Sequence, residues 1–266
     1  MKAVMIGAGN LATSLAPALV EAGIEISQVF SGTLQSAKRL ASVLEKLESN
    51  TCNANLEAIT DISKLDCQAD LYLYAIADNA LTEVIEQVAM QPVPSQAIHL
   101  HTSGSVGIEV LSDKFEHSAV FYPFQTFSRA QRVSMEKVPI LVEATDKATS
   151  ATVEELAHRL SDYVYRVDGE HRQQLHIAGV FANNFVNAMY CIAFKRMQKA
   201  NIPFSVLLPL IDLTAAKVHS MQPSQAQTGP AARRDYNIIN QQLELLNGSE
   251  REIYQQITNY ILSNIN

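Results

Sequence analysis

Three small residues near the amino terminus have the spacing of a phosphate-binding loop. Gly7, Gly9 and Ala12 form a GxGxxA pattern directly after a strand-like run and directly before a helical run. The first glycine of such a loop permits a tight turn, and the second removes the Cβ that would block a pyrophosphate. The helix N-terminus then offers unpaired N–H groups to the phosphates. The pattern predicts a dinucleotide site with Asn10 and Leu11 as further contacts; a purely structural turn is the alternative.

The end of the next predicted strand indicates which nicotinamide dinucleotide would bind. NAD-binding proteins usually place an Asp or Glu about 20 residues after the glycines, where it binds the ribose 2′-hydroxyl. This chain has VFSGT at that position. Ser31 and Thr33 could instead contact a 2′-phosphate, and Lys38 or Arg39 could supply charge. The sequence therefore predicts NADP as the cofactor, although Lys38 and Arg39 fit solvated helix charges equally well.

Two further groups of candidates follow later strand-like runs, where ligands bind in open α/β sheets. Ala77 and Asp78 lie in AIADNAL and are expected beside the cofactor ribose and pyrophosphate; Asp78 could equally cap a helix that begins near Leu81. In HLHTSGSVG, Thr102 and Ser103 are expected to face the nicotinamide.

The same HLHTSGSVG segment contains a titratable group. His101 is a reserve proton donor, because histidine changes its charge near neutral pH. A histidine at the end of a strand is more often a hydrogen-bonded structural group.

A helical segment over 172–199 is apolar on nearly every face, which predicts that it is buried. It contains the polar residues His176, Asn183, Asn184 and Asn187. Buried polar groups need hydrogen-bond partners, which here could be ligand atoms or neighbouring helices across a dimer interface. At about 100° per residue, Asn183 shares a face with His176, whereas Asn184 lies about 80° away.

These candidates need a sheet to bring them together, and the first part of the chain predicts one. Between residues 1 and 168, apolar runs alternate with helix-length segments, as in a parallel sheet covered on both faces. The runs are KAVMIGA, ISQVFS, LYLYAIA, AIHLHTS, SAVFYPF, PILVEAT and YVYRV. We predict a doubly wound, mostly parallel α/β domain over 1–168. After residue 168 the pattern predicts only helices, hence an all-α domain over 169–266. A second copy in a homodimer is expected to cover the apolar helix of this small domain.

The composition excludes several classes of function. The 266 residues are 47% apolar, and 20 basic against 27 acidic side chains give a net charge of −7. This charge disfavours nucleic acid or an anionic membrane as a partner and leaves a small polar molecule. Cys52, Cys67 and Cys191 contain no CxxC pair, so neither a disulfide framework nor a metal site is expected, and a cytoplasmic location fits. No leader and no uninterrupted apolar stretch of about 18 residues is visible, so no membrane span is expected.

Six motifs, taken in order, resemble a known family. They are the glycine loop, AIADNAL, HTSGS, FYPFQTF, HIAGVFANNF and TGPAARRD. The chain resembles proteins assigned as NADP oxidoreductases that couple a Rossmann-like domain to a helical carboxy-terminal domain of unknown function. These are distant relatives of pyrroline-5-carboxylate reductase, ketopantoate reductase and the β-hydroxyacid dehydrogenases. The resemblance covers nearly the whole chain and implies a helical dimerising domain, with the active site between the two domains.

The resemblance also implies site residues. His176 and Asn184 match the histidine and asparagine of HIAGVFANN, so it favours Asn184 where helical angles favour Asn183. Thr102 and Ser103 match the turn that faces the nicotinamide. The matching residues of TGPAARRD are Gly229, Pro230, Arg233 and Asp235.

Two of the motifs are ambiguous. Where many relatives have His-Pro, this chain has Tyr122 and Pro123; a tyrosine with its ordinary pKa of about 10 is a weaker acid at neutral pH. GPAARRD fits a helix start with proline in the first turn, while Arg233 and Arg234 could clamp a substrate carboxylate.

Residues and resemblance together predict an NADP-dependent oxidoreductase. It would move hydride between the nicotinamide and a carbonyl, imine or alcohol carbon of a small polar substrate. His176 is the expected acid/base, Asn184 orients the substrate or the nicotinamide amide, and His101 is in reserve. One alternative is a non-catalytic dinucleotide sensor. The other is a pyrroline-5-carboxylate-type imine reductase, disfavoured because TGPAARRD replaces the hydroxyl-rich loop of those enzymes. The substrate itself does not follow from the fold.

Overall fold

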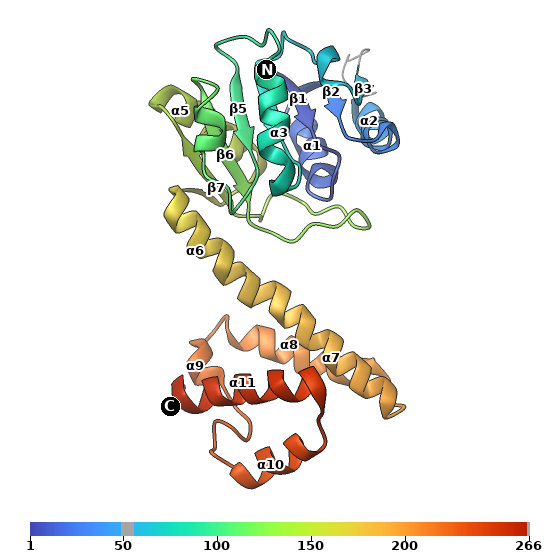
Figure 1. The fold of residues 1–266 in the computed structure, drawn as a ribbon, viewed down its shortest axis with the longest axis vertical. Coiled ribbons are helices and arrows are strands. Elements are labelled where there is room, and N and C mark those ends of the chain that lie inside the picture. Colours follow the sequence, from blue (N-terminus) through green and yellow to red (C-terminus); the bar gives the residue numbers. More distant parts are fainter. Residues whose placement is uncertain (49–55, 265–266) are drawn as a thin grey trace. The chain divides into compact units, whose positions relative to one another are not determined.

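The computed structural model describes residues 1–48 and 56–264, which form an α/β unit followed by a helical unit (Figure 1). Contacts divide the chain into the compact units Met1–Phe181 and Ala182–Asn266. The sequence-based boundary after residue 168 coincides with the start of a helix, α6 (Gly169–Gly179). Contacts place the division later, because this helix packs against the α/β unit over its first turns.

The described part of the α/β unit contains one eight-stranded sheet in the order β3-β2-β1-β4-β5-β6-β7-β8. The strands are β1 (Lys2–Ile6), β2 (Glu25–Phe30), β3 (Glu57–Ile59), β4 (Leu71–Tyr74), β5 (Ile98–His101), β6 (Ser118–Pro123), β7 (Ile140–Ala144) and β8 (Val164–Arg166). Neighbouring strands are parallel except for the antiparallel pair β6 and β7. This confirms the predicted doubly wound, mostly parallel sheet. The seven predicted runs are all strands, while the three-residue β3 has no comparable apolar run.

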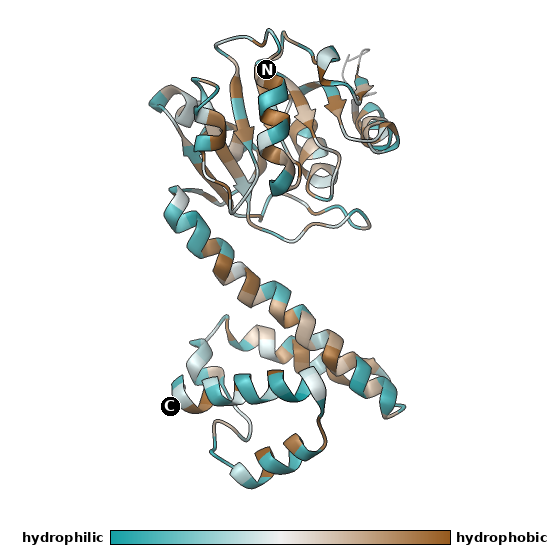
Figure 2. Cartoon of the chain, in the orientation of Figure 1, coloured by the Kyte–Doolittle hydropathy of each residue, from teal (hydrophilic) through white to brown (hydrophobic). Residues whose placement is uncertain are grey.

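Helices cover both faces of this sheet. They are α1 (Ala12–Glu21), α2 (Leu34–Glu48), α3 (Asp78–Ala89), α4 (Glu109–Ser112) and α5 (Lys147–Leu160), with a short 3-10 helix at Ile62–Lys64. Successive side chains of a strand point to opposite faces. Accordingly Ala3 and Met5 belong to a buried cluster with α1, α2 and α5, whereas Val4 and Ile6 belong to a second cluster with α3. The mostly brown strands of Figure 2 are the apolar layer between these helices.

The second unit is entirely helical in its described residues, as predicted. It contains α7 (Val186–Lys199), a 3-10 helix (Phe204–Leu207), α8 (Leu208–Lys217), α9 (Pro223–Ala226), α10 (Tyr236–Glu244) and α11 (Gly248–Asn264). Its buried hydrophobic cluster is small and consists of Ala231, Ile239 and Leu243, with Tyr254, Ile261 and Leu262 packed against it.

Helical structure continues from Gly169 to Lys199 through α6, a π-helical segment (Val180–Phe185) and α7. By length and composition alone this run could cross a membrane, with a mean hydropathy of 1.4 over its most apolar window. None of that window is buried. The described residues of the single chain therefore do not cover its apolar side chains, and the expected burial against a second copy stays a prediction.

The described cysteines, Cys67 and Cys191, are free thiols. Cys52 lies outside the described residues.

Candidate functional site

Six strand ends meet at one edge of the sheet. Because β3, β2, β1, β4, β5 and β6 are parallel, their carboxyl ends lie at the same edge. The sheet grows in opposite directions from β1, which pairs with both β2 and β4. Ligands of open α/β sheets bind outside the carboxyl ends at such a switch point. The candidate residues that follow these strands are thus brought to one place.

The glycine loop has two glycines that are needed for different reasons. Gly7 has φ +124°, and its N–H donates a hydrogen bond to the Phe30 carbonyl at 2.8 Å. A Cβ at Gly7 would lie 2.2 Å from the Ala75 carbonyl oxygen, so the fold itself requires this glycine. At Gly9 the nearest atom to a Cβ would be 3.9 Å away. The fold leaves that space open, which fits the close approach of a phosphate.

The first turn of α1 presents backbone N–H groups beside this space. The Thr13 N–H donates to the Gly9 carbonyl at 3.2 Å, and the Thr13 hydroxyl donates to the Asn10 carbonyl at 2.6 Å. Leu11 is the N-cap residue and has no side-chain cap. Within the described chain, no backbone acceptor is recorded for the N–H groups of Asn10 and Leu11. Such groups at a helix N-terminus suit an anionic ligand.

At the end of β2, the predicted 2′-phosphate contacts Ser31 and Thr33 also form hydrogen bonds within the chain. The Ser31 N–H donates to the Ile59 carbonyl at 3.1 Å. The Thr33 hydroxyl oxygen accepts the Ser36 N–H at 3.3 Å and so caps the first turn of α2. Its hydroxyl hydrogen can still be donated to a ligand. Lys38 and Arg39 are exposed on α2.

Two loops after β4 and β5 are shaped by their own side chains. Helix α3 begins at Asp78 with Ala77 as its N-cap, so the interpretation of Asp78 as a cap for a helix near Leu81 is wrong. The Thr102 hydroxyl donates to the Tyr74 carbonyl at 3.2 Å. The Ser103 hydroxyl oxygen accepts the N–H groups of Ser105 and Val106 at 3.1 and 3.0 Å. These hydroxyls hold the loop in shape.

His101 has a structural role in this loop, which corrects its assignment as a reserve proton donor. It is fully buried, its Nε2 donates to the Gly107 carbonyl at 3.2 Å, and its Nδ1 accepts the Ser103 N–H at 3.2 Å. Burial lowers the pKa of His101 to about 4, and the Arg172 charge acts in the same direction. Because both ring nitrogens are bonded to the backbone of this loop, neither is available to exchange a proton with a substrate.

A tyrosine and a histidine form a hydrogen-bonded pair at the same edge. The Tyr122 hydroxyl, at the end of β6, lies 3.0 Å from His176 Nδ1 on α6. A Cβ at Gly104 would lie 2.6 Å from the Tyr122 ring and 2.7 Å from His176 Nδ1, so the pair packs directly on this glycine. Burial raises the pKa of Tyr122, Asp78 adds to the rise, and Arg172 opposes it. The sequence indicated both side chains separately but not their pairing.

Arg172 holds the first turns of α6 against the sheet. Its side chain is 1% exposed; it pairs with the Glu143 carboxylate on β7 and donates from Nη2 to the Val106 carbonyl at 2.7 Å. Asp168 caps the helix by accepting the His171 N–H at 2.9 Å. Arg172 and His176 are four residues apart and therefore lie on one face of α6. The sequence analysis did not predict a role for Arg172. An arginine in an apolar helical segment indicates that its charge is paired with a carboxylate, here that of Glu143.

Asn184 lies in the π-helical segment and is exposed. A π-helical turn contains about one residue more than an α-helical turn, which shifts the angular position of every later residue by about 100°. The angles that favour Asn183 assume an uninterrupted α-helix and do not hold here.

The TGPAARRD motif differs from the predicted helix start. Residues 230–234 form turns, and α10 begins only at Tyr236. Asp235 caps α10 by accepting the Ile238 N–H at 3.2 Å. Arg233 and Arg234 are exposed, and Arg234 has φ +57°. Gly229 has φ +104°, a left-handed conformation that favours glycine.

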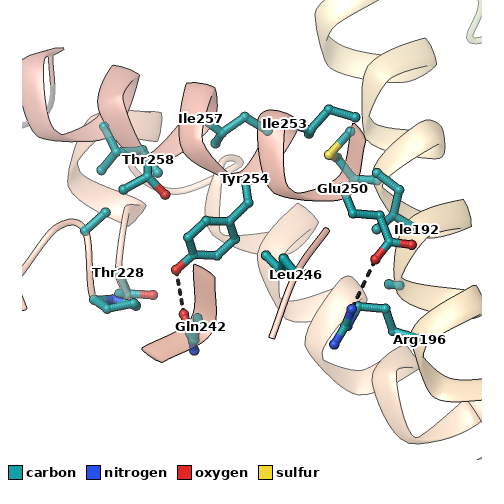
Figure 3. Close-up of a pocket in the computed structure, with 15 residues that line it drawn as sticks. Ile192, Arg196, Thr228, Gln242, Leu246, Glu250, Ile253, Tyr254, Ile257 and Thr258 are labelled. Atoms are coloured by element: carbon teal, nitrogen blue, oxygen red, sulfur yellow. Dashed lines mark hydrogen bonds and ion pairs between the residues drawn. The ribbon is translucent and has the colours of Figure 1, made fainter. Parts of the chain in front are cut away.

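The helical unit contains an apolar cavity of about 410 Å³ between α7, α10 and α11 (Figure 3). Its polar edges are an ion pair between Arg196 and Glu250 at 3.1 Å and a hydrogen bond from Tyr254 to Gln242 at 2.5 Å. Pro230 lines the cavity. The proposed catalytic residues do not line it.

The family models match this arrangement in two parts. Residues 1–123 match a Rossmann-like domain, and residues 138–261 match a domain of unknown function, DUF2520. A protein of Bacteroides fragilis, provisionally named an NADP oxidoreductase, is 38% identical; the match covers 99% of this chain and 98% of that chain, with a TM-score of 0.90. The chain belongs to the family that joins a Rossmann-like domain to a DUF2520 domain.

More distant structures share the fold of this DUF2520 family member. A Thermotoga maritima protein matches with a TM-score of 0.74 and 18% identity, over 99% of this chain and 98% of that chain. A Mycobacterium avium protein provisionally named an oxidoreductase matches with a TM-score of 0.60 and 14% identity, over 97% and 91% of the two chains. No curated protein matches the chain.

Among its described residues, no group of three or more His, Cys, Asp or Glu side chains could hold a metal ion.

Proposed function

We propose that this DUF2520 family member is an NADP-dependent oxidoreductase. It would move a hydride between the nicotinamide and a carbonyl, imine or alcohol carbon of a small polar substrate. The observation that carries the proposal is the hydrogen bond between Tyr122 and His176 at the sheet edge that also holds the glycine loop. The name of the Bacteroides fragilis relative supports NADP as the cofactor.

In this proposal the chain's own residues bind the cofactor and handle the proton. The dinucleotide supplies or accepts the hydride. The open space at Gly9 and the N–H groups of Asn10 and Leu11 bind its phosphates. Ser31 and Thr33 contact the 2′-phosphate.

The proton comes from the hydrogen-bonded pair. In the reducing direction the Tyr122 hydroxyl, held by His176 Nδ1, is available to protonate the substrate oxygen or nitrogen. His176 is the acid/base that restores the Tyr122 proton. Asn184 orients the substrate or the nicotinamide amide, on the strength of the family resemblance.

The proposal also includes a homodimer formed through the helical unit. In the described part of that unit, only Ala231, Ile239, Leu243 and Thr258 are buried, while several large apolar side chains of α7 and α8 are exposed. Exposed apolar surface of this kind marks a protein–protein interface. The apolar cavity between α7, α10 and α11 adds to the surface that a second copy would cover.

The first experiment is a fluorescence titration with NADPH and NADH. The proposal expects binding of both with a preference for NADPH, followed by a substrate screen that records loss of NADPH absorbance. Gly9→Val is the matched variant: its side chain would enter the phosphate space, while the fold has room for its Cβ. It should lose NADPH binding and keep the melting temperature. If the wild-type protein binds neither dinucleotide, the proposed function is wrong; binding without turnover in any screen would favour the sensor.

A further inference from the structure

A long loop between β6 and β7, residues 124–139, is fastened to helix α1. The Val133 N–H donates to the buried Ser14 hydroxyl oxygen at 3.1 Å, and Arg132 pairs with Glu21 at 2.5 Å. Met135 and Val138 are buried in the cluster that contains α1. The loop is therefore held along the helix whose N-terminus adjoins the glycine loop, and it extends from β6 in Figure 1.

Arg129 lies in a tight turn of this loop, which is closed by a bridge between Ser128 and Gln131. Its Nη2 donates to the Ala8 carbonyl at 3.5 Å, so the guanidinium lies over the middle residue of the Gly7–Gly9 turn. The side chain is exposed. The loop path thus brings a cation to the phosphate-binding turn from 121 residues away in the sequence.

The charge of Arg129 has no partner in the described chain. Four other arginines of the described chain form ion pairs: Arg132 with Glu21, Arg172 with Glu143, Arg166 with Glu154 and Arg196 with Glu250. No carboxylate within the described ranges lies in ion-pair distance of Arg129. A guanidinium has five N–H donors, and one weak bond to a carbonyl leaves most of them available.

A cation at this turn would complement the negative charge of a dinucleotide phosphate. The end of β2 offers the hydroxyls of Ser31 and Thr33 but no basic side chain, and Gly32 has open space above its Cα. The hydrogen bond from Gly7 to Phe30 ties the glycine loop directly to that strand end. Arg129 is therefore beside the turn where the pyrophosphate is expected, and that turn is bonded to the end of β2.

We propose that Arg129 binds a phosphate group of the dinucleotide and closes the glycine loop from the β6–β7 side. The guanidinium fork matches two phosphate oxygens with parallel charge-assisted hydrogen bonds. This inference rests on the proposed function, because it assumes a phosphorylated dinucleotide as ligand. The pyrophosphate and the 2′-phosphate share this chemistry, and the experiment separates them.

The test measures dissociation constants for NADPH and NADH with Arg129→Gln, Arg129→Lys and a control, Lys137→Gln. Lys137 is an exposed cation of the same loop. Arg129→Gln should raise the NADPH constant about tenfold or more, Arg129→Lys less, and Lys137→Gln should leave it unchanged. Loss confined to NADPH identifies the 2′-phosphate as the ligand of Arg129, and equal loss for both dinucleotides identifies the pyrophosphate. The salt dependence of NADPH binding should also become shallower in Arg129→Gln.

Two outcomes overturn the inference in different ways. If Arg129→Gln binds both dinucleotides as tightly as the wild type, Arg129 does not bind phosphate and the proposed function still stands. If the wild type binds neither dinucleotide, the inference falls together with the proposed function.

Discussion

The Tyr122–His176 pair brings a phenol hydroxyl and an imidazole nitrogen into hydrogen-bond contact at the sheet edge. A free tyrosine is a weak acid at pH 7, yet here its hydroxyl lies 3.0 Å from an imidazole nitrogen that can return a proton to it. Burial raises the pKa of Tyr122, so the hydroxyl keeps its proton at neutral pH. A donor that stays protonated and has a group beside it that can replace its proton is suited to deliver a proton when a negative charge develops on the substrate.

Replacing Tyr122 by phenylalanine tests this role. Once a substrate is known, Tyr122→Phe should lower kcat about a hundredfold, because general acid catalysis contributes at least that much. The dissociation constant for NADPH should not change. Because the pKa of Tyr122 is raised above 10, the rate of the wild-type reduction should show no loss from Tyr122 ionisation below about pH 10. Tyr165→Phe, an exposed tyrosine on β8, is the control. A Tyr122→Phe enzyme with full kcat would exclude Tyr122 as the donor.

At the scale of elements, α6 decides where His176 lies. Its first turns are held by Asp168 at the cap and by Arg172, which contacts both β7 and the loop after β5. His176 follows Arg172 by one helical turn. The Arg172–Glu143 ion pair therefore positions the histidine without touching a substrate.

The expected effect of Arg172→Met is a loss of both stability and turnover. Removing one partner of a buried ion pair costs about 3 kcal/mol of the free energy of unfolding. The double variant Arg172→Met/Glu143→Leu should recover most of that stability, because no unpaired charge remains. Its kcat should nevertheless stay well below the wild-type value, since the contact from α6 to Val106 is still absent. Denaturant unfolding and steady-state kinetics measure the two effects. Full recovery of kcat in the double variant would leave Arg172 with a purely structural role.

At the scale of the whole molecule, the two units differ in how much apolar surface they bury. The sheet is covered on both faces, whereas the helical unit has a core of three buried residues in its described part. So small a buried core stabilises a unit of this size only weakly. The proposed homodimer would add to the buried apolar area.

Light scattering on a size-exclusion column tests the homodimer. The wild-type protein should elute with twice the chain mass of 29.3 kDa. Leu213→Glu places a charge on an exposed apolar position of α8 and should shift the protein to monomer, because burying an unpaired charge is costly. Met90→Glu, an even more exposed apolar position in the α/β unit, should leave the dimer intact. A wild-type monomer at micromolar concentration would contradict the proposal.

The sequence by itself determined the sheet, the helical second half and the glycine loop. Each of these depends on spacing within a few residues: apolar runs of strand length, helix-length segments between them, and a φ at Gly7 that only glycine adopts easily. Such patterns can be recognised in the sequence because residues close together along the chain also interact within one strand, helix or turn.

Only the tertiary structure decided which candidate side chains work together. Tyr122 and His176 are 54 residues apart, and Arg129 and Ala8 are 121 apart. Their contacts depend on the strand order and on the path of the β6–β7 loop, which no local pattern records. The same reason explains His101: its residue type indicates proton transfer, but its backbone partners and its burial make it structural. A side chain's chemistry follows from its surroundings, and those are set by the fold.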